Sequence, residues 1–217
     1  MIVLTFHGIG EPGRALEEGE ADVWVSRGVY EGVLDLVRGR GEVVVTFDDG
    51  NASDWEIGFP ALRERGMTGR FFLVSDRMDR EGFVRTEWAR EMVGRGMTIG
   101  SHGKAHVAWR GLPDEALREE TVGAKRALEE KVGVRIEEAA CPFGSYDRRV
   151  VRALRDAGFT RVYTSDRWSA DEREFVCARH TVRRGDSVED VRGWIECRAT
   201  ALERLKARAR LMAKRWR

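Results

Sequence analysis

The chain has 217 residues, of which 42% are hydrophobic, so it carries enough apolar material for the core of one domain of moderate size. Its 38 basic and 37 acidic side chains leave a formal net charge of +1, which argues against a dedicated nucleic-acid-binding protein, because such proteins are usually clearly basic. The first residues lack the basic and apolar regions of a signal peptide, and no apolar stretch approaches the length of a membrane span. We therefore expect a cytoplasmic protein without a transmembrane segment.

Short apolar runs alternate with amphipathic segments along the whole chain. Seven runs rich in Val, Ile, Phe or Thr, each bounded by Gly, Asp or Ser, predict β-strands. They are Ile2–Phe6, Val43–Phe47, Gly69–Val74, Met97–Gly100, Glu138–Cys141, Arg161–Thr164 and Phe175–Ala178. Helical periodicity and capping residues predict helices between these strands. They run from Ser26 to Arg38, Asp54 to Arg65, Thr86 to Gly94, Pro113 to about Lys131, Asp147 to Asp156, and Ser187 nearly to Arg217.

This alternation implies parallel strands joined by helical crossovers, in a single domain of residues 1–217. A barrel is favoured over an open sheet, although periodicity alone leaves both open. The last helix, about residues 187–217, is strongly basic, and from Arg198 onward Glu203 is its single acid. Such a helix can cover the barrel, pair with a second copy or contact an anionic surface, and all three are kept as alternatives.

Two adjacent carboxylates, Asp48 and Asp49, follow a predicted strand and precede Gly50. In a barrel of parallel strands, the strand ends form the face on which active sites are built. Neighbouring strand residues point in opposite directions, so one acid can bind a metal while the other stays free as a base. The alternative is an Asp-Asp-Gly turn without function, which is common where a strand ends.

Three of the four histidines also lie at predicted strand ends. His102 and His106 come after the strand that ends at Gly100, and their spacing lets both reach one metal if the segment turns. Exposed loop histidines are the alternative. His7 follows the first strand. One Asp and two His form a facial set for a divalent cation, and a second carboxylate beside that set suits metal-assisted hydrolysis.

These motifs, in this order, resemble those of the polysaccharide deacetylase (NodB-homology, carbohydrate esterase family 4-like) family. Residues 46–50, Thr-Phe-Asp-Asp-Gly, resemble the first motif, and residues 102–106, His-Gly-Lys-Ala-His, resemble the second. Residues 140–146, Ala-Cys-Pro-Phe-Gly-Ser-Tyr, resemble the third motif, and an N-terminal Phe-His matches one branch of the family. The likeness spans roughly residues 1–191. It implies a distorted (β/α) barrel, usually of seven strands, that removes acetyl groups from N-acetylated sugars.

The resemblance also implies a role for each motif side chain. It implies that Asp49, His102 and His106 are metal ligands, that Asp48 is the general base and that His7 is the general acid. We expect Zn²⁺ as the metal, and Co²⁺, Ni²⁺ and Fe²⁺ also suit an Asp-His-His set.

Residues near the motifs are candidates for contact with the substrate. We expect the Phe143 N–H to help stabilise the oxyanion, and Pro142, Tyr146 and Trp168 to line the substrate site. Trp109 also lies near a motif loop. Core packing is the alternative for each of these aromatic residues.

Three features depart from the family pattern. Gly103 replaces a Ser or Thr whose hydroxyl steadies the second motif, and Ala140 stands where many members have an Arg that orients the base. Arg179 is the predicted replacement for that arginine, with Arg183 as the alternative. Asp166 only loosely matches a fourth motif, and it is the second candidate for orienting the base.

The predicted partner is an N-acetylated carbohydrate, either a polymer, an oligosaccharide or a lipid-linked precursor. Two other functions stay open. One is an amidase of the same fold that acts on a non-sugar amide, and the other is a catalytically impaired barrel that binds carbohydrate or acts as a scaffold. The missing arginine at Ala140 favours the impaired barrel, whereas the joint presence of Asp48, Asp49 and the motif histidines argues against it.

Overall fold

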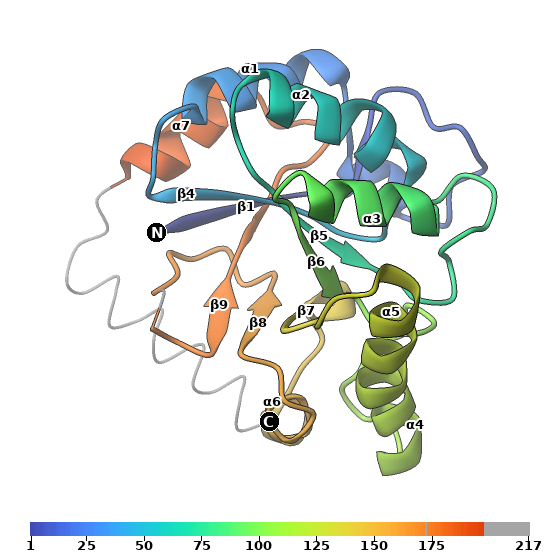
Figure 1. Ribbon diagram of the computed structural model, residues 1–217. Helices are drawn as coiled ribbons and strands as arrows, with labels where there is room; N and C mark the ends of the chain where they lie inside the picture. The colour runs from blue at the N-terminus through green and yellow to red at the C-terminus, as the bar shows by residue number, and fades with distance from the viewer. Residues whose placement is uncertain (172, 198–217) are drawn as a thin grey trace.

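The computed structural model describes residues 1–171 and 173–197. Eight parallel strands form one sheet in the order β10-β1-β4-β5-β6-β7-β8-β9, and the helices lie around it (Figure 1). The strands are β1 (Ile2–Phe6), β4 (Val43–Phe47), β5 (Arg70–Leu73), β6 (Thr98–Ser101), β7 (Glu138–Ala140), β8 (Arg161–Thr164), β9 (Val176–Ala178) and β10 (His180–Thr181). The prediction of a distorted barrel of about seven parallel strands is confirmed.

The barrel is nearly closed by one short segment that is divided between two strands. β9 pairs with β8, whereas β10 pairs with β1 at the other end of the sheet. Only Arg179 separates the two strands. The sequence predicted a strand only over Phe175–Ala178, so β10, which begins after Arg179, is an eighth strand that was not predicted.

The helices follow the predicted order. They are α1 (Arg27–Val37), α2 (Phe59–Glu64), α3 (Thr86–Gly94), α4 (Asp114–Arg118), α5 (Ala124–Val132), α6 (Arg148–Asp156) and α7 (Val188–Glu196). Three helices begin at predicted caps, because the side chains of Ser26, Asp147 and Ser187 accept hydrogen bonds from the N–H groups of Val29, Val150 and Asp190, respectively. α7 packs against α1. The predicted continuation of this basic helix to Arg217, with its possible surface contacts, lies outside the described residues.

Two of the predicted helices contain a π-helical turn. Residues Asp54–Gly58 form such a turn before α2, and residues Glu119–Gly123 form another between α4 and α5. A π turn inserts one extra residue into a helix and is often found at functional sites. The loop after β1 contains a short 3₁₀-helix (Glu20–Val23) and a small parallel pair, β2 (Gly8–Ile9) and β3 (Trp24–Val25).

Alternation along the strands produces two cores, one on each face of the sheet. The larger core lies between the strands and the helices and includes Phe6, Tyr30 and Phe47, whose ring centroids are 4.9–6.0 Å apart. The smaller core fills the barrel interior and includes Phe72 and Tyr163, 5.1 Å apart. Within residues 1–171 and 173–197, no helix combines the length and the apolar composition that crossing a bilayer requires.

Candidate active site

Several strand ends bring polar side chains to the same end of the barrel. His7 follows β1, Asp48 and Asp49 follow β4, His102 follows β6, and Arg179 follows β9. The carboxyl ends of parallel barrel strands share one face, so residues distant in sequence meet there. Asp48 and Arg179, for example, are in contact although 131 positions separate them.

Asp48 forms a buried, two-pronged ion pair with Arg179. The Nη1 of Arg179 donates to Asp48 Oδ1 at 2.7 Å, and its Nη2 donates to Oδ2 at 2.5 Å. The two side chains are only 1% and 2% exposed. Burial raises the pKa of Asp48, but the charge of Arg179, with His102 and His7 nearby, brings the pKa below its usual value. Asp48 is therefore ionised at neutral pH. Arg183, the other arginine considered for orienting the base, is exposed.

The small side chain at position 140 lies in the same inner core as two rings that face Arg179. Ala140 belongs to the inner core together with Phe72 and Tyr163. The Arg179 guanidinium lies 5.4 Å and 5.7 Å from the centroids of these two rings. A guanidinium thus reaches Asp48 from the junction of β9 and β10 and not from the end of β7.

Asp49 and two histidines converge on one point. Asp49 has a left-handed backbone, with φ 72°. Its Oδ1 lies 3.0 Å from the Nε2 of His106 and 3.5 Å from the Nε2 of His102. This oxygen is buried and makes no hydrogen bond of good geometry to any residue described. The ligand atoms of the three residues lie within 4.8 Å of one another, a donor set that fits a divalent cation.

The His102 ring is oriented as a metal ligand requires. Its Nδ1 lies 2.9 Å from the backbone oxygen of Ala140, which can only accept, so Nδ1 carries the proton and Nε2 presents a lone pair. Burial lowers the pKa of His102 to about 4, so the ring is neutral at pH 7. A neutral imidazole whose second nitrogen is held by a carbonyl is typical of metal sites.

Arg77, which sequence reasoning missed, contacts the other histidine. Its Nη2 lies 3.2 Å from the Nδ1 of His106. Because a guanidinium can only donate, Nδ1 is the acceptor, and the neutral His106 ring then carries its proton on Nε2. Arg77 also lies 4.0 Å from Asp49 Oδ1 and donates to Glu17 at 2.7 Å. If His106 bound a cation through Nε2, the ring proton would be on Nδ1. The Arg77 guanidinium, which also only donates, would then have to move away from Nδ1. Arg77 thus places a positive charge beside the set of Asp49, His102 and His106.

His7 also lies near Asp48, with its Nε2 3.9 Å from Asp48 Oδ2. The backbone oxygen of His7 accepts a hydrogen bond from Asn51 Nδ2 at 2.8 Å, which fixes the start of the loop after β1. The Nδ1 of His7 is buried and has no hydrogen-bond partner in the part of the chain that the structure describes.

The loop after β7 places only some of the predicted substrate residues at the site. Pro142 is buried, whereas Phe143, with φ 57°, is 68% exposed and its ring lies 4.6 Å from that of His106. Tyr146 is fully buried, as its core-packing alternative predicts, and its hydroxyl donates to Asp166. Trp109 is also fully buried, as its packing alternative predicts.

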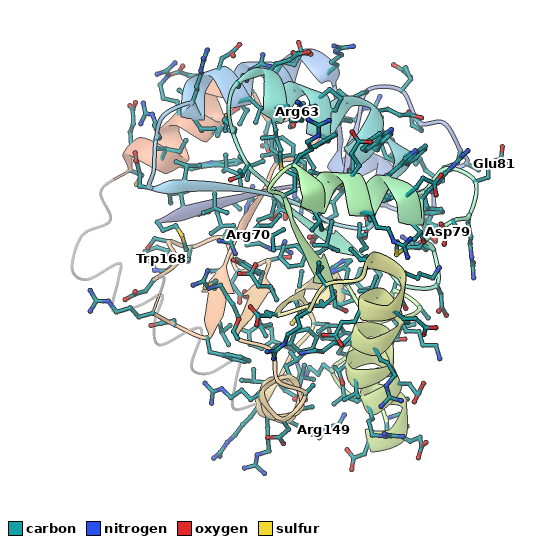
Figure 2. All side chains as sticks on the ribbon, viewed as in Figure 1. Arg63, Arg70, Asp79, Glu81, Arg149 and Trp168 are labelled. Atoms are coloured by element: carbon teal, nitrogen blue, oxygen red, sulfur yellow. The ribbon has the colours of Figure 1, made fainter. Side chains whose placement is uncertain are left out.

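The fourth-motif candidates lie in the loop after β8. Asp166 accepts hydrogen bonds from Thr164 Oγ1 at 2.7 Å and from Tyr146 Oη at 2.8 Å. The loop then runs towards the amino-terminal end of β1, where the Ala170 N–H donates to the Met1 oxygen. Trp168 accordingly lies at the left of Figure 2, on the side where Figure 1 marks the N-terminus. None of the contacts described for these residues places Trp168 beside Asp48.

A third carboxyl group near the site was not predicted either. Asp54 is fully buried in the π turn before α2, and neither of its oxygens has a hydrogen-bond partner among residues 1–171 and 173–197. Burial, followed by the charges of Asp49 and Asp48, raises the pKa of Asp54 well above its usual value. Its neutral form is therefore favoured.

Both the sequence and the fold of this chain have known relatives. The sequence model of the family described as polysaccharide deacetylase matches residues 37–162. YxkH of Bacillus subtilis, provisionally assigned to the polysaccharide deacetylases by its name, is 24% identical over 141 residues, which cover 65% of this chain and 50% of YxkH. The chain spans about half the length of the curated relatives it matches.

Solved structures show the same fold. The polysaccharide deacetylase BC0361 of Bacillus cereus superposes with a TM-score of 0.76 at 22% identity, over 90% of this chain and 68% of BC0361. The deacetylase PplD of Streptococcus pyogenes, solved in complex with acetate, has a TM-score of 0.77 at 15% identity, over 91% of this chain and 98% of PplD. Because the family's sequence model covers more than half of the 217 residues, this chain belongs to the polysaccharide deacetylase family.

Proposed function

We propose that this protein is a metal-dependent hydrolase that removes acetyl groups from an N-acetylated sugar and releases acetate. The observation that carries the proposal is the buried Asp48 carboxylate beside the convergent set of Asp49, His102 and His106. Metal-assisted hydrolysis of an amide requires a carboxylate that lies next to the metal-ligand set but is not itself a ligand.

Asp49, His102 and His106 would hold the ion, with Zn²⁺ as the expected metal and Co²⁺, Ni²⁺ or Fe²⁺ as alternatives. When bound, a divalent ion supplies a Lewis acid for the acetyl carbonyl and lowers the pKa of water.

The side chains of the protein supply the proton transfers. Asp48 Oδ2 lies 3.8 Å from His102 Nε2 and 3.9 Å from His7 Nε2. We assign to Asp48 the removal of a proton from the attacking water. Arg179 holds both oxygens of this carboxylate, which fixes its direction. His7 donates a proton from Nε2 to the leaving amine. The Phe143 N–H helps stabilise the oxyanion, and its exposed ring offers a stacking face to the sugar.

Arg179 also bears on the alternative of a catalytically impaired barrel. The absence of an arginine at position 140 argues for impairment, because the base would then lack a group to orient it. Arg179 brings a guanidinium to the same carboxylate, which supports an active enzyme.

Acetate release from N-acetylglucosamine oligomers tests the proposal. The protein is stripped of metal with a chelator and assayed before and after addition of Zn²⁺ or Co²⁺. We expect activity only with metal, and loss of both activity and metal binding in Asp49→Ala. Metal binding without acetate release from any sugar, together with hydrolysis of other amides, would show that the proposed substrate class is wrong.

Two further variants test the assigned roles. Asp48→Asn is expected to bind metal and to have no turnover, and full activity in this variant would exclude Asp48 as the base. His7→Ala is expected to lower turnover by about 10²- to 10⁴-fold, the usual contribution of acid–base assistance. An unchanged rate would exclude His7 from the mechanism.

A further inference from the structure

The loop that carries both metal-ligand histidines is irregular, and the backbone oxygens of Gly103 and Lys104 accept hydrogen bonds from the Ser75 and Asp76 N–H groups. His102 and His106 are separated by three residues whose backbone N–H groups need acceptors, because an unpaired buried N–H is costly. The Gly103 N–H donates to Ser101 Oγ at 3.2 Å. The next two N–H groups, of residues 104 and 105, have no acceptor within the loop itself and donate outside it.

Their acceptor is a single buried carboxylate, that of Glu120. Its Oε2 accepts from the Lys104 N–H at 2.9 Å, and its Oε1 accepts from the Ala105 N–H at 3.0 Å. The indole N–H of Trp109 approaches Oε2 at 3.4 Å. The Glu120 side chain is only 6% exposed. All three partners are donors, which suits a carboxylate because it only accepts.

Gly103 is matched to this carboxylate in space. A Cβ added at Gly103 would lie 2.6 Å from Glu120 Oε2 and 3.2 Å from Trp109 Nε1. The backbone of Gly103 is also left-handed, with φ 84°. A serine or threonine here would place its side chain where the Glu120 carboxylate lies, so the missing hydroxyl at position 103 and the buried acid at position 120 are two parts of one arrangement.

The π turn between α4 and α5 delivers Glu120 to the loop. Glu120 and Thr121 are consecutive and both buried, and the Thr121 hydroxyl donates to the Leu117 oxygen at 2.8 Å. The preceding residue, Glu119, is 47% exposed and instead pairs with the Lys104 ammonium at 3.2 Å. Two adjacent glutamates therefore contact the same loop. Glu120 binds the backbone of the loop inside the protein, and Glu119 binds the Lys104 side chain at the surface.

We propose that Glu120 is a positioning residue of the metal site, and that its carboxylate fixes the spacing of His102 and His106 through the backbone between them. This inference rests on the proposed metal-dependent function. In the contacts described, Glu120 bonds to the loop backbone and to Trp109 but to no ligand side chain, so the proposed effect acts through the geometry of the loop.

Metal affinity, measured separately from activity, tests this role. Glu120→Gln keeps the size of the side chain but replaces one accepting oxygen by an NH2 group, which is a donor and would face a backbone N–H. We expect Zn²⁺ affinity, measured by calorimetry, to weaken about 10- to 100-fold, the scale seen when an outer-shell partner of a ligand is lost. The absorption spectrum of the Co²⁺ form should change as well. Glu119→Gln is the matched control and should leave both unchanged.

The outcomes separate this inference from the proposed function. If the unaltered protein binds neither Zn²⁺ nor Co²⁺, the metal-dependent function fails. If it binds metal and Glu120→Gln binds equally well with an unchanged Co²⁺ spectrum, the positioning role is overturned. A loss of unfolding stability without a loss of affinity would likewise reduce Glu120 to a structural group.

Two measurements keep the test decisive if Glu120→Gln folds poorly. In the unaltered protein, the amides of Lys104 and Ala105 should exchange slowly with solvent, and rapid exchange of both would contradict the contacts. Gly103→Ala should weaken metal binding by displacing the carboxylate. Its effect should shrink in combination with Glu120→Ala, because the clash is then gone. Full additivity of the two changes would refute the match between residues 103 and 120.

Discussion

Replacement of Arg179 by methionine is expected to destabilise the protein strongly, because it leaves Asp48 as an uncompensated buried charge. Two charge-assisted hydrogen bonds, at 2.7 Å and 2.5 Å, are lost between side chains that are 1% and 2% exposed. Breaking such a pair costs about 3–5 kcal/mol. For a domain of this size, each kcal/mol lowers Tm by about 2–4 °C, so Tm should fall by roughly 6–20 °C.

Urea unfolding followed by tryptophan fluorescence, in the presence of a chelator, measures this loss. The control is Arg149→Met, since Arg149 on α6 (labelled in Figure 2) pairs with Asp114, which is 93% exposed. Exposed pairs contribute about 0–1 kcal/mol. Adding Asp48→Asn to Arg179→Met should restore part of the stability, because no buried charge is left. A loss below about 1 kcal/mol in Arg179→Met, or simple additivity in the double variant, would refute the reasoning.

Three further changes test other parts of the site. Arg77→Gln should tighten Zn²⁺ binding by about tenfold or more in calorimetry, because a cation near His106 no longer faces the guanidinium, and weaker binding would contradict this. Asp54→Asn should become more stabilising as pH rises. In the unfolded chain the Asp54 carboxyl ionises near pH 4, whereas in the folded protein it keeps its proton to higher pH. The folded state therefore binds more protons above pH 4, so the stability of the unaltered protein falls as the pH rises. Urea midpoints of the two proteins between pH 4 and 8, with chelator, should therefore diverge, and a constant difference would exclude this origin. Phe143→Ala should raise KM by about three- to tenfold with little change in kcat or Tm, since the lost ring is exposed, and a lower kcat at unchanged KM would rule out a stacking role.

The sequence predicted the barrel because its strands carry local signals. Runs such as Val43–Phe47 combine β-branched and aromatic residues, and Asp48 and Asp49 stand at the end of one such run. The prediction that His102 and His106 lie near Asp49 follows from the shared face of parallel strands, and the structure brings these three residues together.

The remaining contacts depend on packing between distant segments, for which no local pattern exists. Glu120 lies in an amphipathic helix among other charged residues, and only a π turn directs it to a loop 15 and 16 positions away. Arg77 follows a strand, but nothing in its neighbourhood predicts contact with His106. Tyr146 belongs to a motif loop, but the chain turns its ring into the core, and no local pattern separates this packing role from a substrate contact.

The split strand that closes the barrel has a consequence for the order in which the molecule assembles. Synthesis proceeds from the amino terminus, so β1 and β4 to β8 leave the ribosome before the segment that contains Arg179. Until that segment docks, both edges of the sheet are open and Asp48 lacks the only guanidinium that the described structure pairs with it. Closure of the barrel and the pairing of Asp48 with Arg179 therefore depend on the same short segment, and a nascent chain that has not reached residue 179 lacks the guanidinium that pairs with its central carboxylate.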